Sequence, residues 1–239
     1  MKKVKDAWKN AWDNIGSLDE MYRSYGVRSI MRCFDHVLLG ERKVRILDVG
    51  CGAGFYFKFF RTLGFKELWG LEYDEGNVKK AKELNKNLGV KILQGDIKNL
   101  PRPFEESYFD VIVCLGLIEH FVYPVDIVRK LLKTVKKGGM LILEMPNFRN
   151  WFFHSYNLKR KNKLPFCLWW GIKEWYSVLK RIKGCGLEEV QTADFWTYRA
   201  YLPRALNKIS PKLVDLQIGI ENRLFEKVGS LAFYKLRKV

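Results

Sequence analysis

The sequence lacks long apolar runs and closely spaced cysteines. Its longest uninterrupted apolar stretch, counting one glycine, runs from Val111 to Ile118, far short of the roughly 18 residues that cross a bilayer. Lys2, Lys3 and Lys5 are not followed by an apolar run, so no secretion signal is expected. The five cysteines are odd in number and include no ligand pair, which argues against a disulfide framework and a zinc site. We therefore expect a chain without a transmembrane segment in a reducing cytoplasm.

Acidic residues are scarce relative to basic ones. The 239 residues include 43 lysines and arginines against 26 aspartates and glutamates, a formal charge of +17. Residues 151–239 hold 17 of the basic and 7 of the acidic side chains, so this shorter part carries +10. A positive field favours an anionic partner, either nucleic acid or an anionic membrane surface, and a merely solvated basic surface is the alternative.

Glycines are concentrated after the first apolar strand. Residues Ile46–Gly54 read Ile-Leu-Asp-Val-Gly-Cys-Gly-Ala-Gly, and a helical pattern over 55–63 follows. Such glycines let the backbone turn sharply and approach a ligand at the start of a helix. A dinucleotide loop has a glycine where this chain has Phe55, and Asp48 would repel a pyrophosphate. The loop suits a ligand with ammonium and sulfonium groups, of which S-adenosylmethionine is an example.

Four more motifs follow the glycine loop in order. Glu72 lies 18 residues after Gly54, close to the roughly 20 expected for an acid that binds a ribose. The five motifs are Leu47–Gly54, Trp69–Asp74, Gln94–Ile97, Phe109–Leu115 with Leu117–His120, and Lys136–Leu143. From about Val44 to Asn147 they resemble the class I S-adenosylmethionine-dependent methyltransferases.

The resemblance implies roles for particular residues. Glu72 is expected to receive both ribose hydroxyls, and Asp96 to meet the adenine amino group. Arg28 aligns loosely with an arginine that binds the cofactor's carboxylate in some relatives, and a solvated helix surface is equally compatible. The expected cofactor-binding residues are Arg28, Asp48, Gly50, Cys51, Gly52, Gly54, Glu72, Tyr73, Asp96, Ile97 and Leu115.

Strand-like and helical patterns alternate along the chain, which predicts an α/β fold with a parallel sheet. The expected strands are 44–49, 67–72, 90–94, 109–115, 139–145, 187–195 and 230–237, and the clearest helices 75–88 and 125–135. The resemblance implies a Rossmann-like, mostly parallel seven-stranded sheet with helices on both faces and the last strand antiparallel between the fifth and sixth.

The length and the 48% of apolar residues suit one core, so we expect a single methyltransferase domain over 1–239. Within it we expect an N-terminal helical cap at 1–40 and a cofactor-binding core at 41–146. Residues 147–239 form the acceptor-side segment, with a helical and aromatic insertion after the fifth strand and the last two strands.

Glu119 and His120 follow the fourth strand, where ligands lie in open parallel sheets. We expect both to be catalytic, with His120 as general base for an oxygen nucleophile; a role in shaping the pocket without chemistry is the alternative. Ubiquinone-pathway O-methyltransferases and small-RNA 2′-O-methyltransferases carry Glu, two residues, then Glu-His at this place and bind a divalent metal. Gly116 replaces the first Glu here, so no metal is expected.

The segment 147–176 is dense in aromatic residues and includes the basic cluster 159–163. We interpret it as a lid over an apolar acceptor pocket; an interfacial patch, a nucleic-acid platform and ordinary core packing are the alternatives. No Asn-Pro-Pro-aromatic sequence follows the fourth strand, which argues against methylation of base amino groups.

We therefore expect a methyltransferase that acts on an oxygen or nitrogen of a small-molecule or lipid-like acceptor. Peripheral contact with an anionic membrane or with RNA would involve the basic residues 151–239. The alternatives are an RNA methyltransferase that uses this basic region and a non-catalytic S-adenosylmethionine-binding protein.

Overall fold

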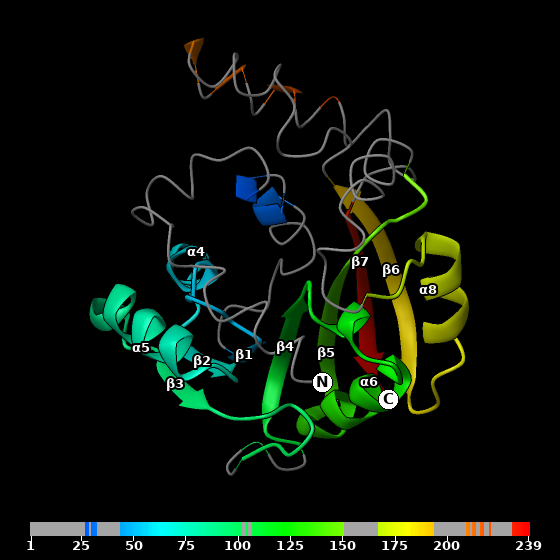
Figure 1. Cartoon of the computed structure of the whole chain (residues 1–239), viewed down its shortest axis with the longest axis horizontal. Helices are drawn as coiled ribbons and strands as arrows, with labels where there is room; N and C mark the ends of the chain where they lie inside the picture. Colours follow the sequence, from blue (N-terminus) through cyan, green and yellow to red (C-terminus); the bar gives the residue numbers. More distant parts are fainter. Residues whose placement is uncertain are drawn as a thin grey trace.

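The computed structural model describes residues 27, 28, 30–32, 44–101, 104, 107–150, 167–193, 209, 210, 212, 213, 216, 217, 220 and 231–239. In this part of the chain, seven strands form one sheet in the order β3-β2-β1-β4-β5-β7-β6 (Figure 1). The strands are β1 (Arg45–Val49), β2 (Glu67–Glu72), β3 (Lys91–Gln94), β4 (Phe109–Leu115), β5 (Val135–Pro146), β6 (Cys185–Ala193) and β7 (Leu231–Lys238).

The first five strands pair in parallel, and β7 is antiparallel to both β5 and β6. The predicted Rossmann-like α/β fold is therefore confirmed, including the insertion of the last strand between the fifth and the sixth. The helices are α4 (Tyr56–Thr62), α5 (Glu75–Leu84), α6 (Pro124–Thr134) and α8 (Ile172–Leu179), with 3-10 turns η1 (Lys86–Leu88) and η2 (Ile118–His120).

Helices cover both faces of the sheet, because successive strand residues point to opposite sides. In β4, Val111 and Val113 pack with the buried residues of α4 and α5, whereas Ile112 and Cys114 pack with those of α6 and α8. Trp175 of α8 is buried on the face of the sheet that α6 and α8 cover. This arrangement explains why the strands are apolar throughout their length instead of alternating with polar residues.

The start of β5 differs from the prediction. We expected this strand to begin at residue 139, but Val135 already pairs with Phe109, and the register then shifts so that Met140 pairs with Val111. The strand begins early because Val135 is fully buried. The intervening residues form a bulge, in which a Cβ at Gly139 would lie 2.6 Å from the Asp110 carbonyl oxygen.

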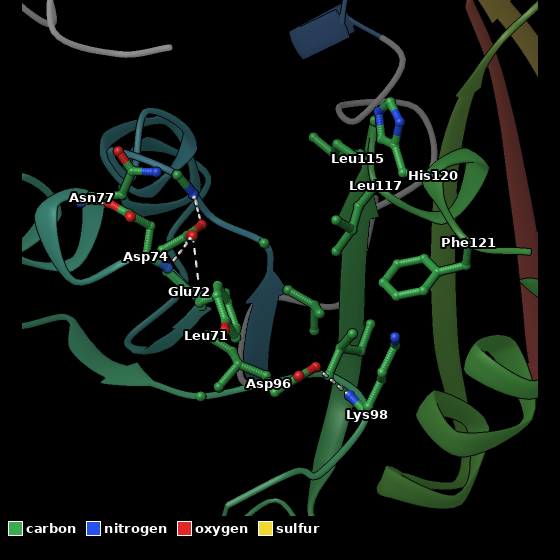
Figure 2. Close-up of a pocket in the computed structure, with 17 residues that line it drawn as sticks. Leu71, Glu72, Asp74, Asn77, Asp96, Lys98, Leu115, Leu117, His120 and Phe121 are labelled. Atoms are coloured by element: carbon green, nitrogen blue, oxygen red, sulfur yellow. Dashed lines mark hydrogen bonds between the residues drawn. The ribbon is translucent and has the colours of Figure 1, made fainter. Parts of the chain in front are cut away.

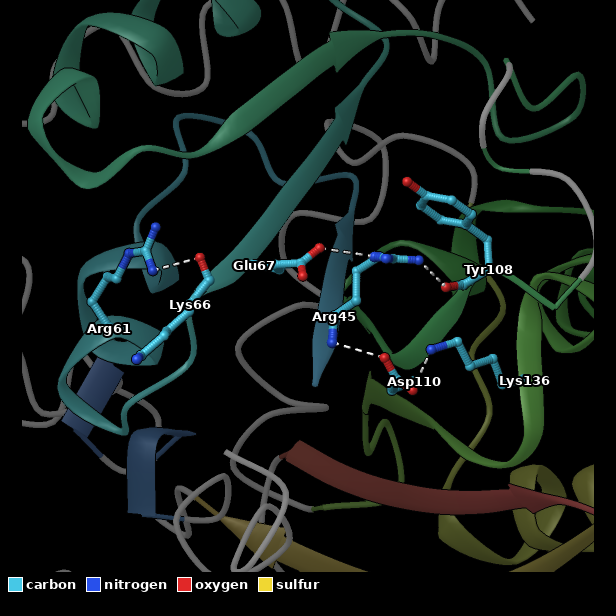
Figure 3. A network of polar contacts seen from close by, with 7 residues as sticks. All are labelled: Arg45, Arg61, Lys66, Glu67, Tyr108, Asp110 and Lys136. Atoms are coloured by element: carbon cyan, nitrogen blue, oxygen red, sulfur yellow. Dashed lines mark hydrogen bonds and ion pairs between the residues drawn. The ribbon is translucent and has the colours of Figure 1, made fainter. Parts of the chain in front are cut away.

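Polar contacts hold the amino ends of the strands (Figure 3). The Asp110 carboxylate accepts a hydrogen bond from the Arg45 backbone N–H at 2.8 Å and pairs with Lys136 Nζ at 2.7 Å. Arg45 also donates to Glu67 Oε2 at 3.0 Å. These contacts join β1, β2, β4 and the β5 bulge at the end of the sheet opposite the carboxyl ends of β1 and β4.

The helix expected over 75–88 ends as an α-helix at Leu84 and continues as the 3-10 turn η1. Asn85 interrupts it, since its buried side-chain amide donates to the Ala81 carbonyl at 2.9 Å. Gly89, which follows the 3-10 turn, has a φ of 61°, which favours glycine.

Several expectations fall outside the described residues. Most of the N-terminal cap, the basic cluster 159–163 and the aromatic residues 151–166 are among them. The aromatic residues at 167–176 divide between the interior and the surface, with Trp175 buried and Tyr176 exposed. In the part of the chain that the structure describes, no helix is long and apolar enough to cross a membrane.

We predict that Gly139→Ala lowers the free energy of unfolding by about 2 kcal/mol or more, because the added methyl group overlaps the Asp110 backbone. Gly186→Ala is the matched control, since a Cβ at Gly186 in β6 meets nothing within 4 Å. The control should stay unchanged or gain up to about 1 kcal/mol. Urea unfolding of both variants tests this; equal losses would contradict the role of the bulge.

Candidate active site

A pocket of about 240 Å³ lies at the carboxyl ends of the central strands, where the strand order reverses between β1 and β4 (Figure 2). Ligands bind at such switch points in open parallel sheets. Its wall is formed by Val49, Gly50, Gly52, Leu71, Glu72, Tyr73, Asp74, Asn77, Gly95, Asp96, Ile97, Lys98, Leu115, Gly116, Leu117, His120 and Phe121.

The glycine loop adopts backbone conformations that favour glycine. Gly50, Gly52 and Gly54 have φ values of 74°, 54° and 76°. A Cβ at Gly50 would lie 2.7 Å from the Leu117 side chain, and one at Gly54 would lie 2.6 Å from the Asn85 amide nitrogen. Gly50 and Gly52 line the pocket, whereas Gly54 allows the loop to pack against Asn85.

Cys51 was also expected at the cofactor but does not line the pocket. Its side chain is buried, and a Cβ at Gly70 of β2 would lie 2.9 Å from its sulfur. Burial is also the main cause that raises the pKa of its thiol well above the ordinary value. The structure therefore gives Cys51 a packing position between β1 and β2.

Glu72 ties the loop to the end of β2. Its Oε2 accepts from the Gly52 N–H at 2.8 Å, and its Oε1 accepts from the N–H groups of Tyr73 and Asp74 at 2.8 and 2.9 Å. Figure 2 shows these contacts at the pocket wall. Three of the roughly four acceptor positions of the carboxylate are used, so Oε2 can also accept a hydrogen bond from a ligand hydroxyl.

Asp48 lies beneath the loop and does not line the pocket. Its side chain is 3% exposed, and its Oδ2 has no hydrogen-bond partner. Burial, and to a smaller extent the charge of Glu72, raise the pKa of Asp48 to about 7. A cationic ligand above the loop would offset the cost of ionising this carboxyl.

Asp96 forms the turn after β3. Its Oδ1 accepts from the Lys98 N–H at 2.9 Å, and its backbone oxygen accepts from the Asn99 N–H at 2.8 Å. Both Asp96 and Ile97 line the pocket, as do Tyr73 and Leu115, so these predicted positions come together. Arg28 is helical and partly buried but is not part of the pocket wall, and its role stays a prediction.

Some wall residues were not foreseen. Asp74 accepts from the Asn77 N–H at 3.0 Å and thereby caps α5. Its position before a helical pattern was the available signal. Lys98 and Phe121 face each other with the ammonium 5.7 Å from the ring centre, a contact between distant segments that no local pattern indicates.

His120 lines the far end of the pocket, while Glu119 lies behind it. Glu119 is 2% exposed, its Oε1 is 3.8 Å from His120 Nε2, and its Oε2 has no hydrogen-bond partner. The two predicted catalytic residues are therefore neighbours, but only His120 reaches the cavity.

A second buried acid, Glu144 of β5, was missed by sequence reasoning. A Cβ at Gly116 would lie 3.8 Å from carboxylate oxygens of both Glu119 and Glu144. Burial, and then the charge of Glu144, raise the pKa of Glu119 well above its usual range. The only signal for Glu144 was a charge within an otherwise apolar strand.

Among the residues that the structure describes, no three His, Cys, Asp or Glu side chains form a group that could hold a metal ion. His154 lies outside these residues.

The strand order, the glycine loop and the acid at the end of β2 together define the fold of class I S-adenosylmethionine-dependent methyltransferases. Residues 47–143 match the family model described as a methyltransferase domain.

Curated relatives include two ubiquinone biosynthesis O-methyltransferases. The one from Rickettsia conorii is 34% identical over 107 residues, which cover 44% of this chain and 36% of the relative. The one from Proteus mirabilis is 32% identical over 146 residues, covering 59% of this chain and 58% of the relative. The chain thus matches between about a third and three fifths of the length of these relatives.

Solved structures share the fold at low identity. A methyltransferase from Thermotoga maritima has a TM-score of 0.66 at 17% identity, covering 98% of this chain and 99% of that one. The plantazolicin methyltransferase, solved with S-adenosylhomocysteine, has a TM-score of 0.61 at 17% identity, covering 99% and 90%. These matches confirm the predicted fold class.

We predict that stability falls with rising pH because of Asp48. An unfolded aspartate loses its proton near pH 3.8, whereas folded Asp48 keeps it up to about pH 7. The unfolded chain therefore binds fewer protons between these values, and the free energy of unfolding falls by on the order of 4 kcal/mol for this group.

Asp48→Asn should remove this part of the pH dependence, as measured by urea unfolding at about pH 4 and pH 8. Asp126→Asn, which changes an exposed aspartate of α6, is the control and should keep the wild-type slope. A slope that persists in Asp48→Asn would show that other groups cause it.

Proposed function

We propose that the chain transfers the methyl group of S-adenosylmethionine to a small-molecule or lipid-like acceptor, with an oxygen nucleophile as the leading case. The supporting observation is one cavity with two distinct ends. Gly50, Gly52 and Glu72 form one end, and Leu117, His120 and Phe121 form the other. The O-methyltransferase relatives support oxygen as the accepting atom.

The residues at the first end fit S-adenosylmethionine. Glu72 has acceptor capacity for ribose hydroxyls, and Leu71 and Ile97 offer apolar surface on which a base can lie. Asp48 supplies a buried carboxyl without a partner on Oδ2, which suits a cationic ligand. When bound, the cofactor supplies an electrophilic methyl group on a positively charged sulfur.

The residues at the second end suit an acceptor. His120 is in position to accept a proton from a hydroxyl, a role that contributes roughly 10²- to 10⁴-fold to a rate. Leu117 and Phe121 offer apolar surface beside it. Holding two reactants in line in such a cavity contributes roughly 7 to 11 kcal/mol.

An RNA acceptor is the second candidate, favoured by the charge of +10 in residues 151–239. The charges of the described pocket wall disfavour an RNA acceptor. Glu72, Asp74 and Asp96 face the cavity with Lys98 as the one lysine among the wall residues, so a polyanion would meet more repulsion than attraction there.

We predict that Glu72→Gln weakens S-adenosylhomocysteine binding by roughly 1 to 3 kcal/mol. The reason is that the side-chain NH₂ of glutamine cannot accept the hydrogen bonds that the Glu72 carboxylate accepts from backbone N–H groups. Calorimetric titration measures the loss. The matched control is Glu75→Gln, three residues further along at the exposed start of α5, which should bind as the wild type does. Tight binding of NAD in place of S-adenosylhomocysteine would refute the proposal.

We predict that His120→Ala lowers kcat by roughly 10²-fold or more toward a hydroxyl acceptor, while the affinity for S-adenosylhomocysteine stays nearly unchanged. Formation of S-adenosylhomocysteine with phenolic and amine acceptors, some carrying isoprenoid tails, gives the readout. An unaltered kcat would leave His120 with a role in shaping the pocket only. Cofactor binding without turnover on any acceptor would support a non-catalytic binding protein.

A further inference from the structure

Three segments of the chain meet at the end of the sheet opposite the pocket. They are residues 133–139, 180–188 and 235–239, and together they hold nine lysines and arginines and one acid, Glu188. The sheet register joins them, because Arg237 of β7 pairs with Met140 of β5 on one side and with Gly186 of β6 on the other. We call the surface formed by these three segments the basic face.

Hydrogen bonds hold the segments of the basic face together. Arg237 Nη1 donates to the Gly138 carbonyl at 2.8 Å, and Lys238 Nζ donates to the Val135 carbonyl at 2.7 Å. In Figure 1, β7 (red) ends here, at the end of the sheet from which β4 starts. The positive charges are therefore placed side by side by the fold, although they come from distant parts of the sequence.

The protein itself neutralises only part of this charge. Glu188 pairs with Arg237 at 2.5 Å, and Asp110 of β4 pairs with Lys136 at 2.7 Å. Four other cations of the basic face are exposed and form no ion pair with a described residue: Lys133, Lys137, Arg181 and Lys183. These four side chains can therefore contact an anion from outside the chain without breaking an internal pair.

The backbone of the basic face is open at two turns. Gly138 and Gly184 have φ values of 76° and 80°, and a Cβ at either position would meet no atom within 4 Å. Each glycine directly follows an exposed lysine, Lys137 or Lys183. Because glycine has no side chain, a ligand can approach the backbone closely at both turns, next to a lysine ammonium group.

The composition of the basic face distinguishes between two anionic partners. Stable docking on a bilayer takes two signals, such as inserted apolar groups together with a basic patch. Within the three segments of the basic face, Val239 alone exposes a large apolar side chain. Non-specific binding of nucleic acid depends on contacts between cations and phosphates, which this surface offers. The basic face therefore fits nucleic-acid phosphates better than a bilayer.

We propose that the basic face binds the phosphate backbone of a nucleic acid, without preference for sequence. The pocket lies at the opposite end of the sheet and shares no residue with this surface. The contact is therefore separate from the proposed methyl transfer, and it is tested without cofactor or acceptor.

The test is fluorescence anisotropy of the full chain with a labelled DNA duplex of about 20 base pairs, over a range of salt concentrations. For the wild type, the logarithm of the affinity should fall linearly with the logarithm of the salt concentration. The double variant Lys137→Gln, Lys183→Gln should bind about fivefold or more weakly at low salt. Its salt slope should be smaller by about 1 to 2, since each lost phosphate contact accounts for roughly 0.9.

The matched control is the double variant Lys82→Gln, Lys86→Gln. It removes the same number of charges from exposed lysines at α5 and η1, outside the basic face. It should bind DNA within about twofold of the wild type, because the contacts depend on where the charges lie and not only on the net charge. Thermal unfolding and S-adenosylhomocysteine affinity should be the same in all three proteins, which separates this contact from folding and from the proposed function.

Three outcomes would overturn the proposal. The first is no DNA binding by the wild type at low salt. The second is an equal loss of affinity in the two double variants, which would assign binding to the net charge alone. The third is binding to vesicles that contain phosphatidylglycerol, weakened by Lys137→Gln, Lys183→Gln, in the absence of DNA binding. That result would assign the basic face to a membrane surface.

Discussion

The Glu72 carboxylate is the interaction on which the geometry of the site depends. It accepts three backbone N–H groups from two segments, the glycine loop after β1 and the turn after β2. Gly50 and Gly52 adopt left-handed backbone conformations, which regular helices and strands do not contain. The conformation of the loop therefore has to be held by a hydrogen bond from outside it. The turn is fixed by the same side chain, and Asp74 within it caps α5. One acid therefore sets the loop, the turn and the start of a helix together.

Buried acids at the carboxyl ends of the strands form two groups. Asp48 and Glu72 belong to the glycine-loop end, and Glu119 and Glu144 to the His120 end. Both groups affect Cys114 of β4. The pKa of its thiol is raised mainly by burial and then by the charges of Glu119, Asp48 and Glu144. Cys114 is therefore a core residue and not a nucleophile. Within the first group, Glu72 is stabilised by backbone donors and Asp48 suits a cationic ligand, whereas burial and the charge of Glu144 raise the pKa of Glu119.

The sequence predicted those parts of the fold and site that depend on neighbouring residues. A strand followed by glycines or an acid shows both the element and its ligand-facing end, so the positions of Gly50, Glu72 and Asp96 on the pocket wall could be expected. The strand order came from the resemblance alone, since hydrophobic spacing does not say which strands pair. Contacts between distant segments were not readable: Asn85 against Gly54, Val135 against Phe109, and Glu144 beneath Gly116. Each of these contacts shifted the boundary of a helix or strand, or changed the role expected of a residue.

The pocket and the surface have opposite electrostatic characters, and this limits how the chain's charge can act. A net charge of +17 draws anionic partners from a distance, but the acids of the pocket wall do not continue that field inward. An acceptor that reached the pocket because of its own negative charge would be opposed where the chemistry takes place. Under the proposed function, an uncharged hydroxyl avoids this repulsion, because it can approach His120 without bringing a negative charge next to Glu72, Asp74 and Asp96.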